Sequence, residues 1–495
     1  MNSPGPQGNL EPPNYSFVNL EDNERREIDN PLARQEPAQI RHDARRFAHR
    51  HFPREGLSKL FVKAALVARD PLSFESVEGL TTKERDTLSK ETTTSFWAQP
   101  KGLRVTTITL CVAAIIQGWN QTGSNGANLN WPTAFGLADR KGQLNDTKAT
   151  WIFAAVNAVT YFAASLVGCW LSDPLNEFAY GRRGAIFLSG LFCLASVIGG
   201  ACTHSWRQLF ACRFLLGVGM GSKASVTPIM GAEVSPAHLR GSLVRLNVLS
   251  VMALESDIWC VVRRMVLTLE ISIFLGFSSN LVVSHIGPLG WRFQTAAAFL
   301  PAIVLLSLIL VCPESPRFLL KKGRYREAYR SLLQLRETPL QAARDLYYMN
   351  CQLQAEAMLI SSNRGELRPG LELGQLNHQN GPGVTGSETS SNTESEDGGT
   401  PDNPPQAQGD SWWKRAWRGL VEFTKDLRIR GNPEDLDGFQ REVQHTGYIT
   451  RFAQLFRKKR IRRATVAAAV VMISQQLCGV GATLSFDASP RYDGS

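Results

Sequence analysis

Long apolar segments alternate with polar, charged segments along the 495 residues of the chain. A helix needs about 20 mainly apolar residues to cross a hydrocarbon layer about 30 Å thick. The segments that meet this requirement are 104–122, 150–171, 184–203, 208–232, 265–286, 293–312 and 464–483. Backbone amides in lipid must bond within their own segment, so these segments are predicted to be helices. The pattern therefore predicts an all-α polytopic membrane protein.

The same pattern divides the chain into an N-terminal region, a six-helix bundle, a central loop and a seventh helix with a short tail. These parts are residues 1–102, 103–312, 313–462 and 463–495. The N-terminal region is predicted to be largely disordered, because residues 1–56 are rich in Pro, Asn, Glu and Arg. The central loop begins with a helical pattern and contains a low-complexity stretch at 361–410.

Basic residues gather after the second, fourth and sixth predicted helices, whereas the other loops between these helices carry fewer net positive charges. They are Arg182, Arg183, Arg240, Arg245, Arg317, Lys321, Lys322 and Arg324. Loops rich in Lys and Arg stay in the cytoplasm. The N-terminus is therefore predicted to be cytoplasmic. It has no apolar core of a cleavable signal peptide, so the first helix would direct insertion.

The net charge of +10 has two interpretations, nucleic-acid binding or basic cytoplasmic loops. The second is the common one in membrane proteins and is preferred, so no nucleic-acid partner is predicted. The nine cysteines stand singly, without metal-ligand spacing. No Ser-His-Asp arrangement or phosphate-binding glycine loop is evident. We therefore predict no metal, no cofactor and no enzymatic activity.

Two segments fit the pattern poorly. Residues 243–272 place Glu255, Asp257, Arg263 and Arg264 where a helix hairpin is expected to continue. Charges cost several kcal/mol each in lipid, so we interpret this segment as an extended cytoplasmic loop that is foreign to the fold. Residues 481–495 form an abrupt polar tail, and the two segments together raise the question of whether they are native.

Charged and glycine-rich motifs stand at the ends of the predicted helices. They are GCWLSDPLNEFAYGRRG after the second helix, RFLLGVGMGSKASVTPIMGAEVSPAHLRG at the fourth, and PESPRFLLKKGR after the sixth. The three glycines at 217, 219 and 221 thin one face of a helix for close packing. Each charged motif alone is equally consistent with a membrane anchor and with a functional latch.

Together, and in this order, the motifs resemble those of the sugar porter family of the major facilitator superfamily. The matching residues include Arg182, Arg183, Arg213, Glu233, Arg240, Glu314 and Arg317, with a QQ-x-x-G motif at Gln475, Gln476 and Gly479. The GWNQTGSNGANLNWP stretch and the long polar tails resemble the larger fungal sugar and polyol transporters, including inositol-transporter-like ones.

The resemblance implies two bundles of six helices that rock around a substrate site at the bilayer midplane. It implies a hexose or an inositol-class polyol as substrate, a plasma-membrane location and the proton as a second candidate partner. It also implies inter-bundle gating contacts at the charged helix ends. Their residues would be Asp173, Arg182, Arg183, Arg213, Glu233, Arg240, Glu314 and Arg317.

A sugar presents many hydroxyls and no charge, so its site needs amides and aromatic faces. The candidates are Gln117, Trp119, Asn120 and Gln121 in the first helix and Gln475 and Gln476 in the seventh. Gln475 has a structural alternative, an interhelical hydrogen bond worth about 0.6–2 kcal/mol. Its position in the family motif favours the sugar contact.

The chain also departs from the family pattern. Asn120 stands where proton-coupled relatives carry an aspartate, which favours facilitated diffusion because an amide does not titrate. Helices eight to twelve are absent, so the chain is interpreted as C-terminally truncated. Two functions follow: a sugar or polyol transporter, or a truncated, non-transporting or sensor-like product.

Overall fold

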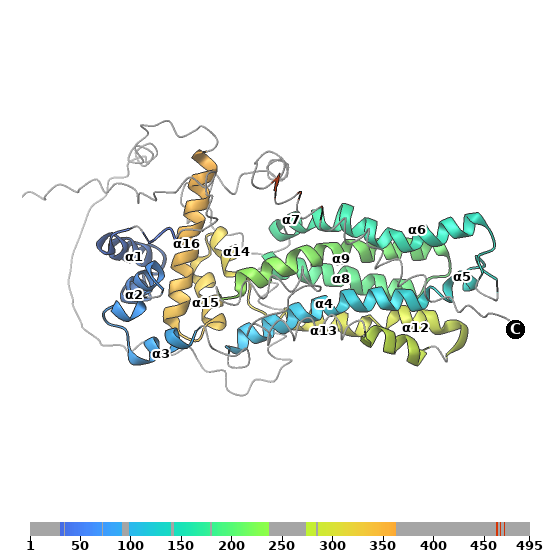
Figure 1. The fold of residues 1–495 in the computed structure, drawn as a ribbon, viewed down its shortest axis with the longest axis horizontal. Helices are drawn as coiled ribbons and strands as arrows, with labels where there is room; N and C mark the ends of the chain where they lie inside the picture. Colours follow the sequence, from blue (N-terminus) through green and yellow to red (C-terminus); the bar gives the residue numbers. More distant parts are fainter. Residues whose placement is uncertain are drawn as a thin grey trace, which may run out of the picture.

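The computed structural model describes residues 30–33, 35–71, 73–91, 99–139, 143–178, 181–236, 274–283 and 286–362, together with positions 462, 463, 466 and 470. These residues form helices and connecting turns, and the β-pairing among them is a single isolated bridge between Ala138 and Leu144. Long helices run side by side in an elongated bundle, and shorter helices gather at one end of it (Figure 1). The prediction of an all-α polytopic protein is confirmed.

The bundle contains five helices that are long and apolar enough to cross a membrane. They are α4 (Lys101–Ala127), α6 and α7 joined over Thr147–Asn176, α8 (Gly181–Ala201), α9 (Trp206–Val234), and α12 and α13 joined over Gly290–Ile309. The individual bounds are Thr147–Ala163 for α6, Cys169–Phe178 for α7, Gly290–Ala296 for α12 and Phe299–Ile309 for α13. All five coincide with spans predicted from the sequence.

The other two predicted spans are covered only in part. A shorter apolar helix, Phe274–Val283, lies within the predicted span 265–286. The predicted span 464–483 lies outside the described residues except for positions 466 and 470. The irregular segment 243–272 and the tail 481–495 also lie outside them. Short elements complete the bundle: α5 (Trp131–Ala134) and the 3₁₀ turn Gly287–Leu289.

Helix α9 packs closely against α6 because glycines line the contact. A Cβ added at Gly217 would lie 2.2 Å from the Thr160 carbonyl oxygen, and one at Gly221 would lie 2.2 Å from that of Ala164. A π-helical turn, Ala164–Gly168, joins α6 to α7 at this contact. The Ser222 hydroxyl donates to the Gly168 carbonyl at 2.9 Å. The predicted close packing is therefore confirmed for Gly217 and Gly221, but Gly219 lies on a different face, where an added Cβ would be 2.9 Å from the Ser189 carbonyl oxygen of α8.

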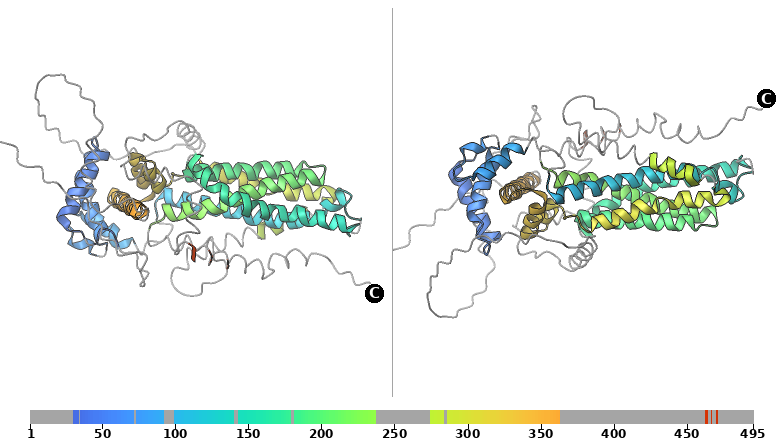
Figure 2. Two further views of the ribbon diagram at one scale, coloured as in Figure 1. Left: turned by 90° about the horizontal axis from the view of Figure 1, so that it is seen from above. Right: turned by 90° about the horizontal axis from the view of Figure 1, so that it is seen from below.

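At one end of the bundle, six helices form a smaller domain, here called the helical cap (Figures 1 and 2). They are α1 (Pro37–His51), α2 (Ser58–Arg69), α3 (Thr82–Lys90), α14 (Pro316–Lys321), α15 (Tyr325–Leu335) and α16 (Pro339–Ser362), with a 3₁₀ turn at Phe74–Ser76. Most of their apolar side chains form one core, which is distinct from the core of the bundle, whereas Leu335 of α15 packs into the core of the bundle.

Helix α1 corrects the prediction of disorder for residues 37–51, whereas residues 1–29 lie outside the described residues. Its buried residues Ile40, Ala44, Phe47 and Ala48 fall on one face. The Phe47 ring lies 5.4 Å from that of Phe61 on α2 and 5.6 Å from that of Tyr347 on α16, between ring centroids. Composition alone indicated disorder because α1 is polar on average. Its apolar face is buried by helices that follow it at a distance in the sequence.

Candidate functional site

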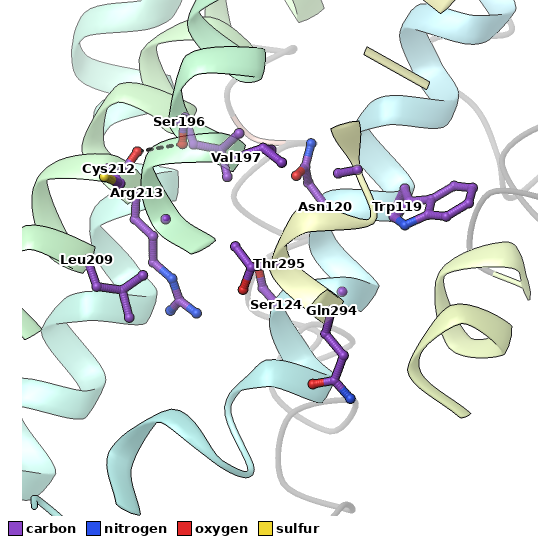
Figure 3. Close-up of a pocket in the computed structure, with 14 residues that line it drawn as sticks. Trp119, Asn120, Ser124, Ser196, Val197, Leu209, Cys212, Arg213, Gln294 and Thr295 are labelled. Carbon is purple, nitrogen blue, oxygen red and sulfur yellow. Dashed lines mark hydrogen bonds between the residues drawn. The ribbon is translucent and has the colours of Figure 1, made fainter. Parts of the chain in front are cut away.

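A pocket opens between four helices of the bundle, with about 400 Å³ of empty volume that includes space open to solvent. The lining residues come from α4, α8, α9, and α12 with the turn after it. They are Trp119, Asn120, Gly123 and Ser124 (α4), Ser196, Val197 and Gly200 (α8), Leu209, Cys212, Arg213 and Leu216 (α9), and Gln294, Thr295 and Ala298 (α12 and the turn). Figure 3 shows these side chains, with the Ser196 hydroxyl donating to the Cys212 carbonyl at 2.7 Å.

Two of the residues predicted to contact substrate, Trp119 and Asn120, line this pocket. Asn120 is buried, and its amide nitrogen donates to the Ile116 carbonyl at 2.9 Å, which leaves its side-chain oxygen as an acceptor. Gln117 and Gln121 are exposed and are not among the lining residues. Gln121 bonds to Tyr161 on α6 instead. Gln475 and Gln476 lie outside the described residues.

Gln294 is a pocket residue that the sequence analysis missed. It is 4% exposed, and its side-chain oxygen has no hydrogen-bond partner among the described residues. Trp119, also in the lining, has a buried indole N–H that is equally unpaired within the described ranges. A buried polar group without a partner costs about 1–3 kcal/mol. Gln294 and Trp119 therefore add one unsatisfied acceptor and one unsatisfied donor to the helices around the pocket, although Figure 3 shows both side chains directed away from Arg213 and Cys212. A polar residue inside the apolar span 293–312 was the signal for Gln294.

Arg213 also lines the pocket, although the sequence analysis grouped it with the gating motifs. Its guanidinium donates to the side-chain oxygens of Asn157 and Asn128, the latter at 3.1 Å, and to the Val156 carbonyl at 3.4 Å. It also lies over the Trp131 ring, 5.8 Å from the centroid. These partners are neutral. The positive charge of Arg213 is therefore not paired with a carboxylate among the described residues.

A charged cluster lies at the opposite end of α8 and α9, where the bundle meets the helical cap. The Arg182 guanidinium donates to both carboxylate oxygens of Glu233, from Nε and from Nη2, at 3.1 Å each. Both side chains are largely buried. The Ser315 hydroxyl donates to Glu233 at 2.6 Å. A two-point bond of this kind fixes the ends of α8 and α9 relative to each other.

Glu314 occupies the N-terminus of α8. Its carboxylate accepts the backbone N–H groups of Arg182 at 3.1 Å, of Arg183 at 3.3 Å and of Ser315 at 2.8 Å. A helix N-terminus favours such an anion. Burial nevertheless raises the pKa of Glu314 to about 7, against the opposing effect of these donors and of Arg183. The carboxyl therefore titrates near neutral pH.

Arg183 connects the same helix end to α13. Its guanidinium donates to the Ile309 carbonyl at 2.9 Å and to the Leu310 carbonyl. Asp173 lies on α7 and Arg317 on α14, and neither takes part in the Arg182–Glu233 pair. Arg240 lies outside the described residues. The gating contacts were expected between two bundles. The ones described here join helices of one bundle to each other and to the cap.

Comparison with known proteins places these features in a family. The model of the family described as "Sugar (and other) transporter" matches residues 106–253 and 261–357. The hexose transporter HXT10 of Saccharomyces cerevisiae is 30% identical over 237 residues, covering 45% of this chain and 38% of that protein. The D-xylose-proton symporter of Escherichia coli is 26% identical over 202 residues, covering 35% and 38%.

The proton myo-inositol cotransporter of Homo sapiens is 33% identical over 174 residues, covering 35% of this chain and 24% of that protein. The chain thus spans less than half the length of each of these three relatives.

Proposed function

The chain belongs to the sugar transporter family, the sugar porters of the major facilitator superfamily, and from this premise we propose that it moves a sugar or polyol across a membrane by alternating access. It is an integral, multi-pass membrane protein of a family of transporters rather than of enzymes. Hexoses and inositols are the proposed substrate class. A plasma-membrane location and a cytoplasmic N-terminus complete the proposal, the latter supported by the basic loops.

The observation that carries the proposal is a pair of unsatisfied polar atoms on two residues that line the pocket. The Gln294 carbonyl oxygen and the Trp119 indole N–H lack partners within the described part of the chain. A ligand hydroxyl both donates and accepts, so a polyhydroxylated ligand satisfies both groups. The Trp119 ring adds an apolar face of the kind that sugar rings pack against. Gln475 and Gln476 of the seventh helix are proposed as further contacts, whereas the exposed Gln117 and Gln121 lack support from the pocket.

The charged cluster is proposed to act as a gate. Rocking of a bundle requires contacts at the membrane surface that hold in one state and release in another. The Arg182–Glu233 pair and the Glu314 carboxylate fix the ends of α8 and α9 next to the helical cap. We expect these contacts to stabilise one state of the cycle, with Asp173, Arg240 and Arg317 contributing from the same end of the bundle.

Proton coupling through Asn120 is not supported, because an amide side chain binds no proton at physiological pH. The lining residues named above contain no carboxylate. Transport is therefore either facilitated or coupled through a different residue.

Uptake of labelled hexoses and myo-inositol by vesicles that contain the purified chain tests the proposal. We expect saturable uptake that falls about 5- to 150-fold in Gln294→Ala, since an unpaired buried partner costs about 1–3 kcal/mol. Gln143→Ala, an exposed glutamine outside the pocket, is the matched control and should transport like the wild type. Uptake equal to that of empty vesicles would overturn the transporter proposal and favour a sensor-like product.

A further inference from the structure

Lys223 is buried in the middle of a membrane-crossing helix. It lies on α9 and is 1% exposed, which places it among the largest fully buried side chains of the described residues. Its ammonium nitrogen has no hydrogen-bond partner within the described ranges, and no ion pair involves it there. A lysine has three donors and no acceptor, so the charged form leaves every one of them unsatisfied at this position.

The surroundings of Lys223 offer little to stabilise a charge. The titratable group that faces it is the thiol of Cys193 on α8, which is itself fully buried and packs with Leu216 and Met220. Other titratable residues lie on the helices packed against α9 but make no bond to the Lys223 nitrogen. They are Lys148 and Tyr161 on α6, Cys169 and Asp173 on α7, Arg182 and Arg183 on α8, Lys101, Arg104 and Cys111 on α4, and Arg317 and Lys321 on α14.

An unpaired charge in the membrane interior costs several kcal/mol, and ionisable residues there mark ion and proton pathways. Lys223 is neither at a helix end, where a long side chain reaches water, nor beside a carboxylate. The enclosed state described here therefore favours the neutral amine. An opened state that admits water favours the ammonium.

The position of Lys223 connects it to the pocket. Leu216 lines the pocket and also packs in the small cluster with Cys193, the residue that Lys223 faces. Arg213, another lining residue, precedes Lys223 by ten positions on α9, about 15 Å along a helix. Water that enters the pocket when the bundle opens is thus separated from Lys223 by this cluster, while Asn120 in the pocket itself binds no proton.

We propose that Lys223 is a proton-binding site of the transport cycle. Its amine takes a proton from water when opening of the bundle admits water, and the resulting ammonium returns that proton to water when the helices enclose it again. Only an N–H bond forms and breaks, and no electron is transferred. The inference rests on the proposed transport function for its role in coupling, whereas the proton binding itself is testable without transport.

Equilibrium unfolding in detergent tests the proton binding directly. A lysine that is neutral when enclosed takes up one proton on unfolding, so the ratio of unfolded to folded protein rises about tenfold for each unit fall in pH. Relative to Lys223→Met, the wild type should show this extra slope between pH 7 and 9. Lys148→Met removes an exposed lysine and should keep the slope of the wild type. Equal slopes for the wild type and Lys223→Met would overturn the proposal.

Uptake into vesicles with an imposed pH gradient tests the coupling. The wild type should accumulate sugar above the outside concentration when the outside is acidic, and Lys223→Met should equilibrate it without accumulation. Lys223→Arg, whose charge does not titrate, should behave like Lys223→Met. Accumulation that survives in Lys223→Met would overturn the coupling role. Absence of all uptake in the wild type would instead contradict the transport function, and the unfolding experiment would still decide whether Lys223 binds a proton.

Discussion

The guanidinium of Arg344 donates to both oxygens of Glu91, at 2.7 and 2.8 Å, across a separation of 253 residues. Arg344 also pairs with Asp345 at 2.9 Å, and Asp345 accepts from Arg336 at 2.6 Å. Arg336 in turn donates to the Val234 carbonyl at the end of α9, at 3.1 Å. A continuous series of polar contacts therefore connects the N-terminal helices of the cap to the end of α9, beside Glu233.

Glu91→Gln should loosen the N-terminal helices without unfolding the bundle. The substitution removes the charge from a largely buried pair, while Arg344 keeps its contact with Asp345, so we expect a loss of about 1–3 kcal/mol in the opening free energy of α1–α3. Hydrogen exchange of residues 37–91 measures it. Glu78→Gln, an exposed acid on the same segment, is the control. Exchange that is equally slow in both variants would contradict the proposed connection.

Glu314 should make the stability of the fold depend on pH near neutrality. Burial raises its pKa to about 7 from an ordinary value of 4.5. The folded state therefore binds more protons than the unfolded state between these values. The resulting stabilisation is complete below about pH 4.5 and is lost as the pH rises through about 7, by about 3 kcal/mol in total.

Thermal unfolding of the wild type and Glu314→Gln, compared from pH 4.5 to 8, measures this dependence. The amide keeps a neutral acceptor for the backbone N–H groups of α8, so the variant should lack the loss seen in the wild type. Glu337→Gln, which changes an exposed acid between α15 and α16, should follow the wild type. Parallel profiles for wild type and Glu314→Gln would show that this carboxyl stays ionised throughout.

The Arg182–Glu233 pair should show strong energetic coupling. The two side chains are 14% and 10% exposed and share two hydrogen bonds. A double-mutant cycle with Arg182→Met and Glu233→Gln should give a coupling free energy of about 1–3 kcal/mol. The exposed pair Lys90–Asp86 is the control, with an expected value below about 1 kcal/mol. Similar coupling for both pairs would contradict the gating role.

Gly217→Ala should destabilise the bundle. The added methyl would lie 2.2 Å from the Thr160 carbonyl oxygen, so α6 and α9 must separate, at a cost of about 1–3 kcal/mol. Gly231→Ala is the matched control on the same helix. Its methyl would lie 3.4 Å from the end of the Leu110 side chain and should cost less than about 1 kcal/mol. Thermal unfolding in detergent compares the two, and equal midpoints would refute the close contact.

The bundle was predictable because its signal is local. A run of about 20 apolar residues marks a membrane helix whatever it packs against, and the glycines at 217 and 221 marked the face of α9 that contacts α6. The motifs also located Arg182, Glu233 and Glu314 at helix ends. The residues that they pair with were not predictable, because the sequence does not show which helix ends lie next to each other in the fold.

The helical pattern at the start of the central loop is confirmed by α16, but helix α1, the packing of the cap and part of the pocket depend on distant residues and were missed for that reason. Helix α1 is polar on average, and the aromatic residues that bury Phe47 are on α2, α15 and α16. Gln294 is one polar residue within an apolar span, and its place in the pocket follows from the packing of α12 against α4. The burial of Lys223 likewise depends on the packing of α8 against α9. The residues next to Lys223 in the sequence do not indicate this contact.

The shared core of the helical cap has a consequence for the order in which the protein assembles. Tyr347 follows Phe47 by 300 positions, and the membrane-crossing helices of the bundle are made between them. At about 5–20 residues per second, a ribosome needs roughly 15–60 s to cover that distance. During this interval the apolar face of α1 lacks its partner on α16 and is exposed to chaperones. Helix α1 is synthesised before the bundle but is therefore among the last of the described helices to reach its final packing, after the bundle has entered the membrane.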